Sequence, residues 1–135
     1  RNPVPTITPI ISWDPAVDYL ALYLDSLTKV ETVDAGLTSP SHGETIDDHR
    51  RRAGEIREHH VVRCGVIRGA IAAGEPSAHE IVPKLWARQL SPFNYRFALD
   101  EVLAHLEYMK GRDEVECRAV NGALRWRPRI ETGAA

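Results

Sequence analysis

The sequence lacks several features that would each indicate a particular class of protein. It has only two cysteines, Cys64 and Cys117, which lie far apart and fit no metal-ligand spacing, so we expect reduced thiols rather than a disulfide framework. No apolar run approaches the roughly 18 residues of a membrane span, and no basic start followed by an apolar stretch indicates a signal peptide. We therefore expect a cytoplasmic protein without a membrane segment.

A large excess of charge of either sign is also missing. The 17 Lys and Arg residues nearly balance the 19 Asp and Glu residues, which leaves a formal net charge of -2 at pH 7. Such a chain is not attracted as a whole to nucleic acid or to anionic lipid. Hydrophobic residues make up 43% and charged residues 27% of the chain, a mixture typical of a folded globular domain. Binding to nucleic acid would need a local basic patch.

The first 44 residues combine a proline-rich start with one amphipathic segment. The prolines within residues 1–12 oppose helix and central-strand pairing, so we expect an extended loop there. Asp14-Pro15 is typical of a helix start, and apolar residues then recur at spacings of three and four. The apolar run at residues 35–39 predicts a short strand, followed by a loop at residues 40–43.

The rest of the chain, up to residue 128, predicts three helices. A long helix is expected after Thr45, which forms an incomplete capping box with Asp48, and its apolar face repeats as far as Ile71. Ser77 and Glu80 have the full capping-box spacing and predict the start of a second helix. A third helix is expected over residues 94–110, with Gly111 as its C-terminal stop.

A β-hairpin is the clearest local prediction. Asn121-Gly122 favours a type I′ turn between two strands, which places Cys117 opposite Trp126 and Glu116 opposite Arg127. One face of such a hairpin is apolar, so we expect that face to pack on the helices. Three helices followed by a hairpin is the order of a winged helix. The predicted fold class is mainly α with a C-terminal β-hairpin.

Four short motifs occur in order along nearly the whole chain. They are Tyr19-Leu20, the loop Pro40-Ser41-His42-Gly43, the helix start at residues 77–81, and Leu-Ala-His-Leu at residues 103–106. This order resembles the C-terminal half of metallo-β-lactamase-fold hydrolases with a winged-helix tail, of the β-lactamase-like protein 2 type. Ser41 departs from the glycine that is usual in the family's loop, which can alter the backbone there but leaves the histidine in place.

The resemblance implies a metal site. In the family the histidine of this loop is a metal ligand, so the resemblance assigns His42 that role, and imidazole suits zinc. The other ligands of the family come from an upstream His-x-His-x-Asp-His motif, a further histidine and a bridging aspartate, and this sequence contains no His-x-His. A catalytic zinc needs about three protein ligands. We therefore expect a zinc-dependent hydrolase in the intact parent, and expect this chain alone to be inactive and to bind zinc weakly.

The resemblance also implies a division of the chain. Residues 1–44 would be a C-terminal remnant of the αββα catalytic domain, residues 45–128 a winged-helix-like domain, and residues 129–135 a flexible tail. Because the chain starts at Arg1 rather than Met, we interpret it as a piece of a longer protein. Its main expected partner is the missing N-terminal half.

Two other functions remain open. The chain could be a stand-alone winged-helix module for nucleic acid or protein, since arginines along the hairpin would give a basic wing. The third helix carries several acidic residues, which does not favour contact with phosphates. Alternatively, the chain could serve in dimerisation. His60, which lies on the apolar stripe of the long helix, is expected to be a packed or capping histidine rather than a ligand.

Overall fold

A computed structural model describes residues 9–130, which contain four helices and one two-stranded antiparallel sheet. The elements, in chain order, are α1 (Tyr19–Glu31), α2 (His49–Ala72), α3 (Ala78–Leu85), α4 (Pro92–Gly111), β1 (Val115–Val120) and β2 (Ala123–Pro128). The predicted fold class, mainly α with a C-terminal β-hairpin, is therefore confirmed. None of the helices within the described range has the length and apolar character needed to span a bilayer.

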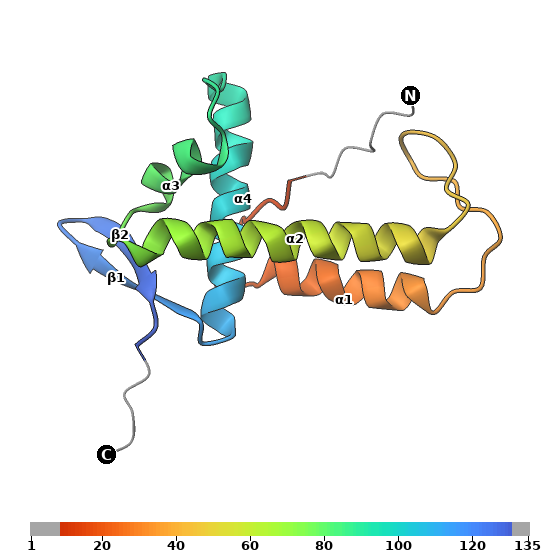
Figure 1. Cartoon of the computed structure of the whole chain (residues 1–135), viewed down its shortest axis with the longest axis horizontal. Helices are drawn as coiled ribbons and strands as arrows, with labels where there is room; N and C mark the ends of the chain where they lie inside the picture. Colours follow the sequence, from red (N-terminus) through yellow and green to blue (C-terminus); the bar gives the residue numbers. More distant parts are fainter. Residues whose placement is uncertain (1–8, 131–135) are drawn as a thin grey trace, which may run out of the picture.

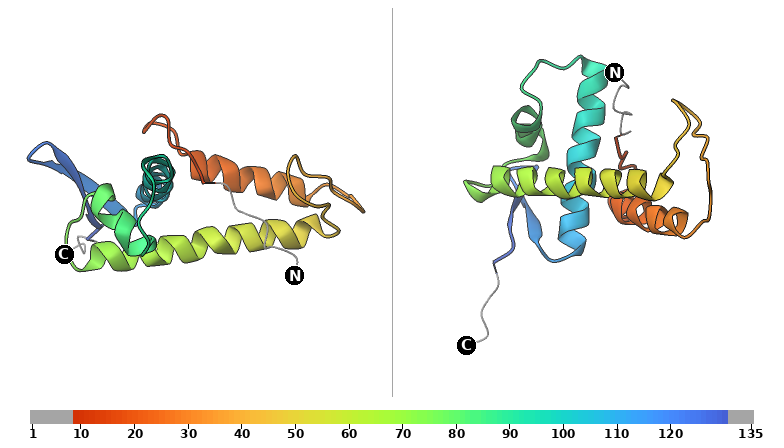
Figure 2. Two further views of the ribbon diagram at one scale, coloured as in Figure 1. Left: turned by 90° about the horizontal axis from the view of Figure 1, so that it is seen from above. Right: turned by 45° about the vertical axis from the view of Figure 1, so that its right-hand side comes forward.

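Helix α2 is the longest element, and the others are arranged along it. Helix α1 runs antiparallel beside its N-terminal half, and residues 32–48 connect the two at that end (Figure 1). Helix α3 and the hairpin lie at the opposite end, while α4 crosses between the two groups (Figure 2). The structure therefore has two ends, one formed by the loop before α2 and one by the hairpin.

The main core lies where α2, α3, α4 and the base of the hairpin meet. Its fully buried members include Ile67 of α2, Ile81 of α3, Leu106 of α4 and Trp126 of β2. The backbone N–H of Trp126 also donates to the carbonyl of Pro76 over 3.0 Å, which ties β2 to the segment before α3. Removing these large apolar side chains from water is the main source of stability at this end.

The hairpin has the register that the sequence predicts. Cys117 pairs with Trp126 and Glu116 with Arg127. The turn residues Asn121 and Gly122 have φ values of 50° and 79°, as a type I′ turn requires. Only the base of the predicted apolar face packs on the helices, because Leu124, near the tip, is 52% exposed. The tip projects beyond the helices (Figure 1).

Two predicted helix starts are wrong by about one turn. Helix α1 begins after Asp18, whose Oδ1 accepts from the N–H of Ala21, and not at Asp14. Asp14 instead accepts from the N–H of Ala16 in a local turn, which competes with capping. Helix α2 is capped by Asp48 rather than Thr45, in line with the stronger preference for aspartate at this position.

The capping box of Ser77 and Glu80 is confirmed, with both of its hydrogen bonds formed. The strand predicted over residues 35–39 is wrong, since it is reduced to a single bridge between Thr38 and Ile46. Helix α4 ends at Gly111, but the left-handed residue that turns the chain is Asp113, with φ of 60°.

Candidate functional site

His42, the predicted metal ligand, lies in the loop between α1 and α2. The loop is closed by two backbone hydrogen bonds between Thr38 and Ile46, of 2.9 and 2.8 Å, and Gly43 within it has φ of 91°. The side chain of His42 is exposed. Within residues 9–130, no group of three or more potential metal ligands includes it. A single exposed imidazole does not make a zinc site, which needs about three protein ligands, so the described residues alone do not fit a zinc ion at His42.

A different set of histidines meets inside the protein, where α2 crosses α4. His60 of α2 is 1% exposed, and His105 and Glu101 of α4 are 0% and 4% exposed. Nδ1 of His60 lies 3.0 Å from Nε2 of His105, and Nδ1 of His105 lies 2.7 Å from the carbonyl oxygen of Glu101. The burial of His60 agrees with its predicted place on the apolar stripe. Its two partners were not predicted from the sequence, although Glu101 and His105 are four residues apart on the buried face of α4.

Burial keeps both of these histidines neutral near pH 7. It lowers the pKa of His60 to about 4, and repulsion from His59 and Arg63 acts in the same direction. Burial also lowers the pKa of His105 to about 3, although the hydrogen bond to the carbonyl of Glu101 works against this change. Desolvation raises the pKa of Glu101, opposed by a hydrogen bond from the backbone N–H of Ile10 to its Oε2 at 2.9 Å.

The hydrogen bonds determine the tautomers of the two rings. A carbonyl oxygen can only accept, so Nδ1 of His105 carries its proton. Because the ring is neutral, its Nε2 has a lone pair and must accept from Nδ1 of His60. Nε2 of His60 is then left with a lone pair, and this buried atom has no hydrogen-bond partner among the described residues. Such an atom is an exception that calls for an explanation.

His59, the neighbour of His60 on α2, completes a group of potential metal ligands. One ligand atom each of His59, His60 and Glu101 lies within 4.8 Å of the other two. The rings of His59 and His60 have centroids 5.1 Å apart. His59 and Glu101 also line a cavity of about 480 Å³, together with Arg63, whose guanidinium stacks on Trp86. This group of three potential ligands is therefore open to the cavity on the side of His59.

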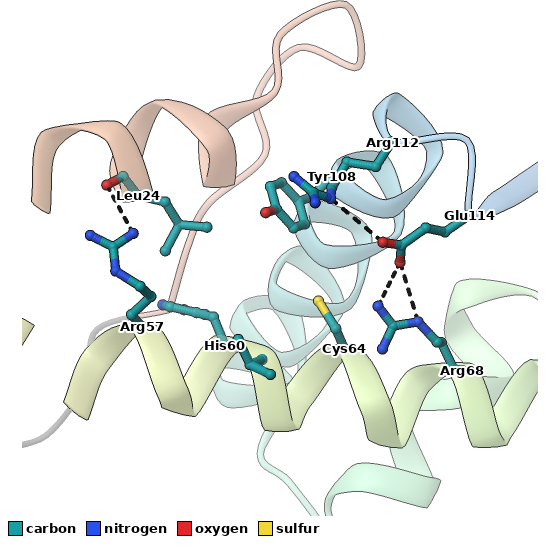
Figure 3. A pocket seen from close by; sticks show the side chains of 9 residues that line it. Leu24, Arg57, His60, Cys64, Arg68, Tyr108, Arg112 and Glu114 are labelled. Carbon is teal, nitrogen blue, oxygen red and sulfur yellow. Dashed lines mark hydrogen bonds and ion pairs between the residues drawn. The ribbon is translucent and has the colours of Figure 1, made fainter. Parts of the chain in front are cut away.

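A second cavity, of about 250 Å³, lies between α1, α2 and α4, and His60 is among the residues that line it (Figure 3). Its arginines are all paired: Arg57 donates to the carbonyl of Leu24 and to Glu31, while Arg68 and Arg112 both contact Glu114. Burial raises the pKa of the Cys64 thiol in its wall to about 11. This thiol is therefore a poor nucleophile near neutral pH.

The arginines of the hairpin also have acidic partners. Arg118 and Arg127 contact Glu75, Arg125 contacts Glu80, and Arg129 contacts Asp113. Arg127 is shared with Glu116 on the facing strand. A basic wing that binds phosphates would need these charges free, and here carboxylates already neutralise them.

Residues 64–129 match the family model "Metallo-beta-lactamase-like, C-terminal domain". The structure is similar to the crystal structure of a beta-lactamase domain protein from Burkholderia ambifaria, with 34% sequence identity, a TM-score of 0.81 and coverage of 89% of this chain. The chain belongs to the metallo-β-lactamase-like family, as a C-terminal part.

The second similar structure is a metallo-beta-lactamase family protein from Thermus thermophilus. It shares 29% identity with this metallo-β-lactamase-like chain, with a TM-score of 0.70 over 83% of it. The chain spans only 36% of the Burkholderia protein and 34% of the Thermus protein. No curated protein matches the sequence. The predicted resemblance to the C-terminal part of metallo-β-lactamase-fold proteins is thus confirmed.

Proposed function

We propose that this chain is the C-terminal part of a zinc-dependent hydrolase, in which His42 supplies one of the zinc ligands. The chain itself is then non-catalytic. The observation that carries the proposal is the 34% identity to a beta-lactamase domain protein over 89% of this chain. A family of this kind implies a metal site in the intact protein, and imidazole is among the ligands that zinc prefers.

The surroundings of His42 support a ligand role. Its loop lies at the end of α2 opposite the hairpin, so it is separated from the main core (Figure 1). The bridge between Thr38 and Ile46 restrains the loop, while the side chain of His42 remains exposed. An imidazole held in this way can reach ligands that belong to a preceding part of the protein.

Exposed apolar side chains on the same half support a preceding domain as the partner. They are Trp13, Leu22, Val30, Val33 and Leu37, which are between 45% and 71% exposed. A surface of this kind on an isolated chain is typical of an interface that another domain covers. We propose that residues 1–44 complete the catalytic domain, while residues 45–128 support it as a helical domain.

The test uses the full-length protein and measures zinc by mass spectrometry after dialysis against a weak chelator. We expect His42→Ala to lower the zinc content and to reduce hydrolase activity by several orders of magnitude. His79→Ala is the matched control, because His79 lies outside the loop, in the first turn of α3. If His42→Ala retains the zinc content and activity of the control, His42 is not a ligand.

The alternative, a stand-alone winged-helix module that binds nucleic acid, has weaker support. It depends on a basic surface formed by the four hairpin arginines, but each of these arginines contacts a carboxylate. Gel shifts on DNA and RNA at low and moderate salt would test it. We expect no salt-dependent shift, because the hairpin arginines are already paired and cannot readily replace the counterions of a phosphate backbone.

A further inference from the structure

We propose that His59, His60 and Glu101 form a second metal site, for a divalent ion of the zinc type, at the crossing of α2 and α4. This site is independent of His42 and of the proposed zinc-dependent hydrolase. Two imidazoles and one carboxylate form a ligand set that zinc uses in catalytic sites, where a fourth position is left to water or substrate.

The positions of the ligand atoms are compatible with a bound ion. The three atoms lie within 4.8 Å of one another. The ligand atoms of a tetrahedral zinc lie about 3.4 Å apart, given a zinc–nitrogen distance of about 2.1 Å. A bound ion would therefore require rotation of the side chains. His59 is the ligand best able to adjust, because it is only partly buried.

His60 has one buried nitrogen without a hydrogen-bond partner among the described residues. This atom is Nε2, and the residue is 1% exposed. An unsatisfied buried acceptor costs about 1–3 kcal/mol, and a bound cation would remove that cost.

The other nitrogen of His60 is already placed as in known metal sites. A histidine that binds a metal almost always donates its second N–H to a fixed acceptor. Nδ1 of His60 does so to His105, which is itself held by the carbonyl of Glu101. His105 is therefore a positioning residue, which keeps the lone pair of His60 on Nε2.

Charge and access also suit a cation, with one opposing contribution. Glu101 supplies a carboxylate with little competition from water, since it is 4% exposed. The cavity of about 480 Å³ beside His59 and Glu101 offers a path of entry. Arg63 lines the same cavity, and its positive charge repels a metal ion. Removal of that charge should therefore strengthen binding.

The test is a calorimetric titration of the 135-residue chain with zinc, after all metal has been removed with a chelator. We expect one equivalent to bind, His59→Gln to weaken binding at least about tenfold, and Arg63→Gln to tighten it. Each variant must keep the far-ultraviolet circular dichroism of the wild type. The opposite effects of these two variants cannot both result from loss of folding.

Two controls separate this site from the one proposed at His42. His42→Gln and His79→Gln should bind zinc as the wild type does. Loss of binding in His42→Gln with none in His59→Gln would assign the ion to the loop and overturn the second site. Absence of binding by the wild type would overturn it as well.

Long-range ¹H–¹⁵N spectra of the imidazoles provide a readout that does not depend on affinity. We expect the proton of His60 on Nδ1 before zinc is added, and we expect zinc to shift the resonance of its Nε2. His105 should keep its proton on Nδ1 throughout, as expected for a positioning residue. If zinc leaves Nε2 of His60 unchanged, His60 is not a ligand.

Discussion

His60 donates a hydrogen bond from Nδ1 to Nε2 of His105 over 3.0 Å, in a part of the core where neither ring is more than 1% exposed. The two residues are 45 positions apart and join α2 to α4. Because both rings are neutral and the carbonyl of Glu101 accepts from His105, the proton positions follow from the heavy atoms. This pair therefore links the packing of the two helices to the chemistry of the buried site.

His105→Ala should strongly destabilise the protein. The change leaves a cavity and removes the acceptor for Nδ1 of His60, so we expect a loss of about 2–4 kcal/mol in the free energy of unfolding. Urea denaturation followed by circular dichroism would measure it. His42→Ala, at an exposed position, should change stability by less than about 0.5 kcal/mol. Equal effects of the two variants would contradict the role of the pair.

The protein should become less stable as the pH falls below about 6.5. Unfolded histidines take up protons near a pKa of about 6.5, whereas the folded pKa is about 4 for His60 and about 3 for His105. Between these values the unfolded state binds more protons, so each pH unit costs up to about 1.4 kcal/mol for each histidine. The full contribution is present above the unfolded pKa and is lost as the pH falls toward the folded values.

Urea denaturation at several pH values, in the presence of a chelator, would test this dependence. Replacement of one histidine, as in His105→Leu, should make the pH dependence shallower. Glu101, whose pKa is raised by burial, acts in the opposite sense at the acidic end of the range. An unchanged pH dependence in His105→Leu would show that the buried pair does not control it.

Two glycine substitutions should have opposite effects on stability. Gly122 has φ of 79°, so Gly122→Ala should strain the hairpin turn and cost about 1 kcal/mol. Gly69 is an exposed residue inside α2 with open space around it, and Gly69→Ala should stabilise the helix by about 1 kcal/mol. Thermal unfolding of both variants would measure the difference. A similar shift of Tm in the same direction for both would contradict the turn geometry.

The two cysteines should differ in their reactivity toward a thiol reagent. Cys64 is 4% exposed, and burial raises its pKa to about 11, so little thiolate forms near pH 8. Cys117 is only partly buried and serves as the internal comparison. We expect one thiol to react readily in the folded protein and both to react in denaturant. Rapid reaction of both thiols without denaturant would show that the core opens at Cys64.

Local features were the ones that could be predicted from the sequence. The capping box of Ser77 and Glu80 and the hairpin at Asn121-Gly122 agree with the structure, because each is decided within a few residues. Asp14 and Asp18 are one turn apart and either could cap the N-terminus of α1. The sequence pattern favoured Asp14, whereas Asp18 is the cap in the structure. His42 stays a prediction, because its expected fellow ligands are not among the described residues.

The amino-acid order was thus enough to define the four helices, the hairpin with its register and the resemblance to the metallo-β-lactamase-like family. The meeting of His59 and His60 with Glu101 and His105 depended on the fold alone. The separation along the chain between the pair on α2 and the pair on α4 carries no signal, because the crossing point of the two helices is decided by the packing of apolar faces from distant segments. The same packing removes water from the two rings, which lowers their pKa values, and it brings the rings into the hydrogen bonds that leave a free lone pair on Nε2 of His60.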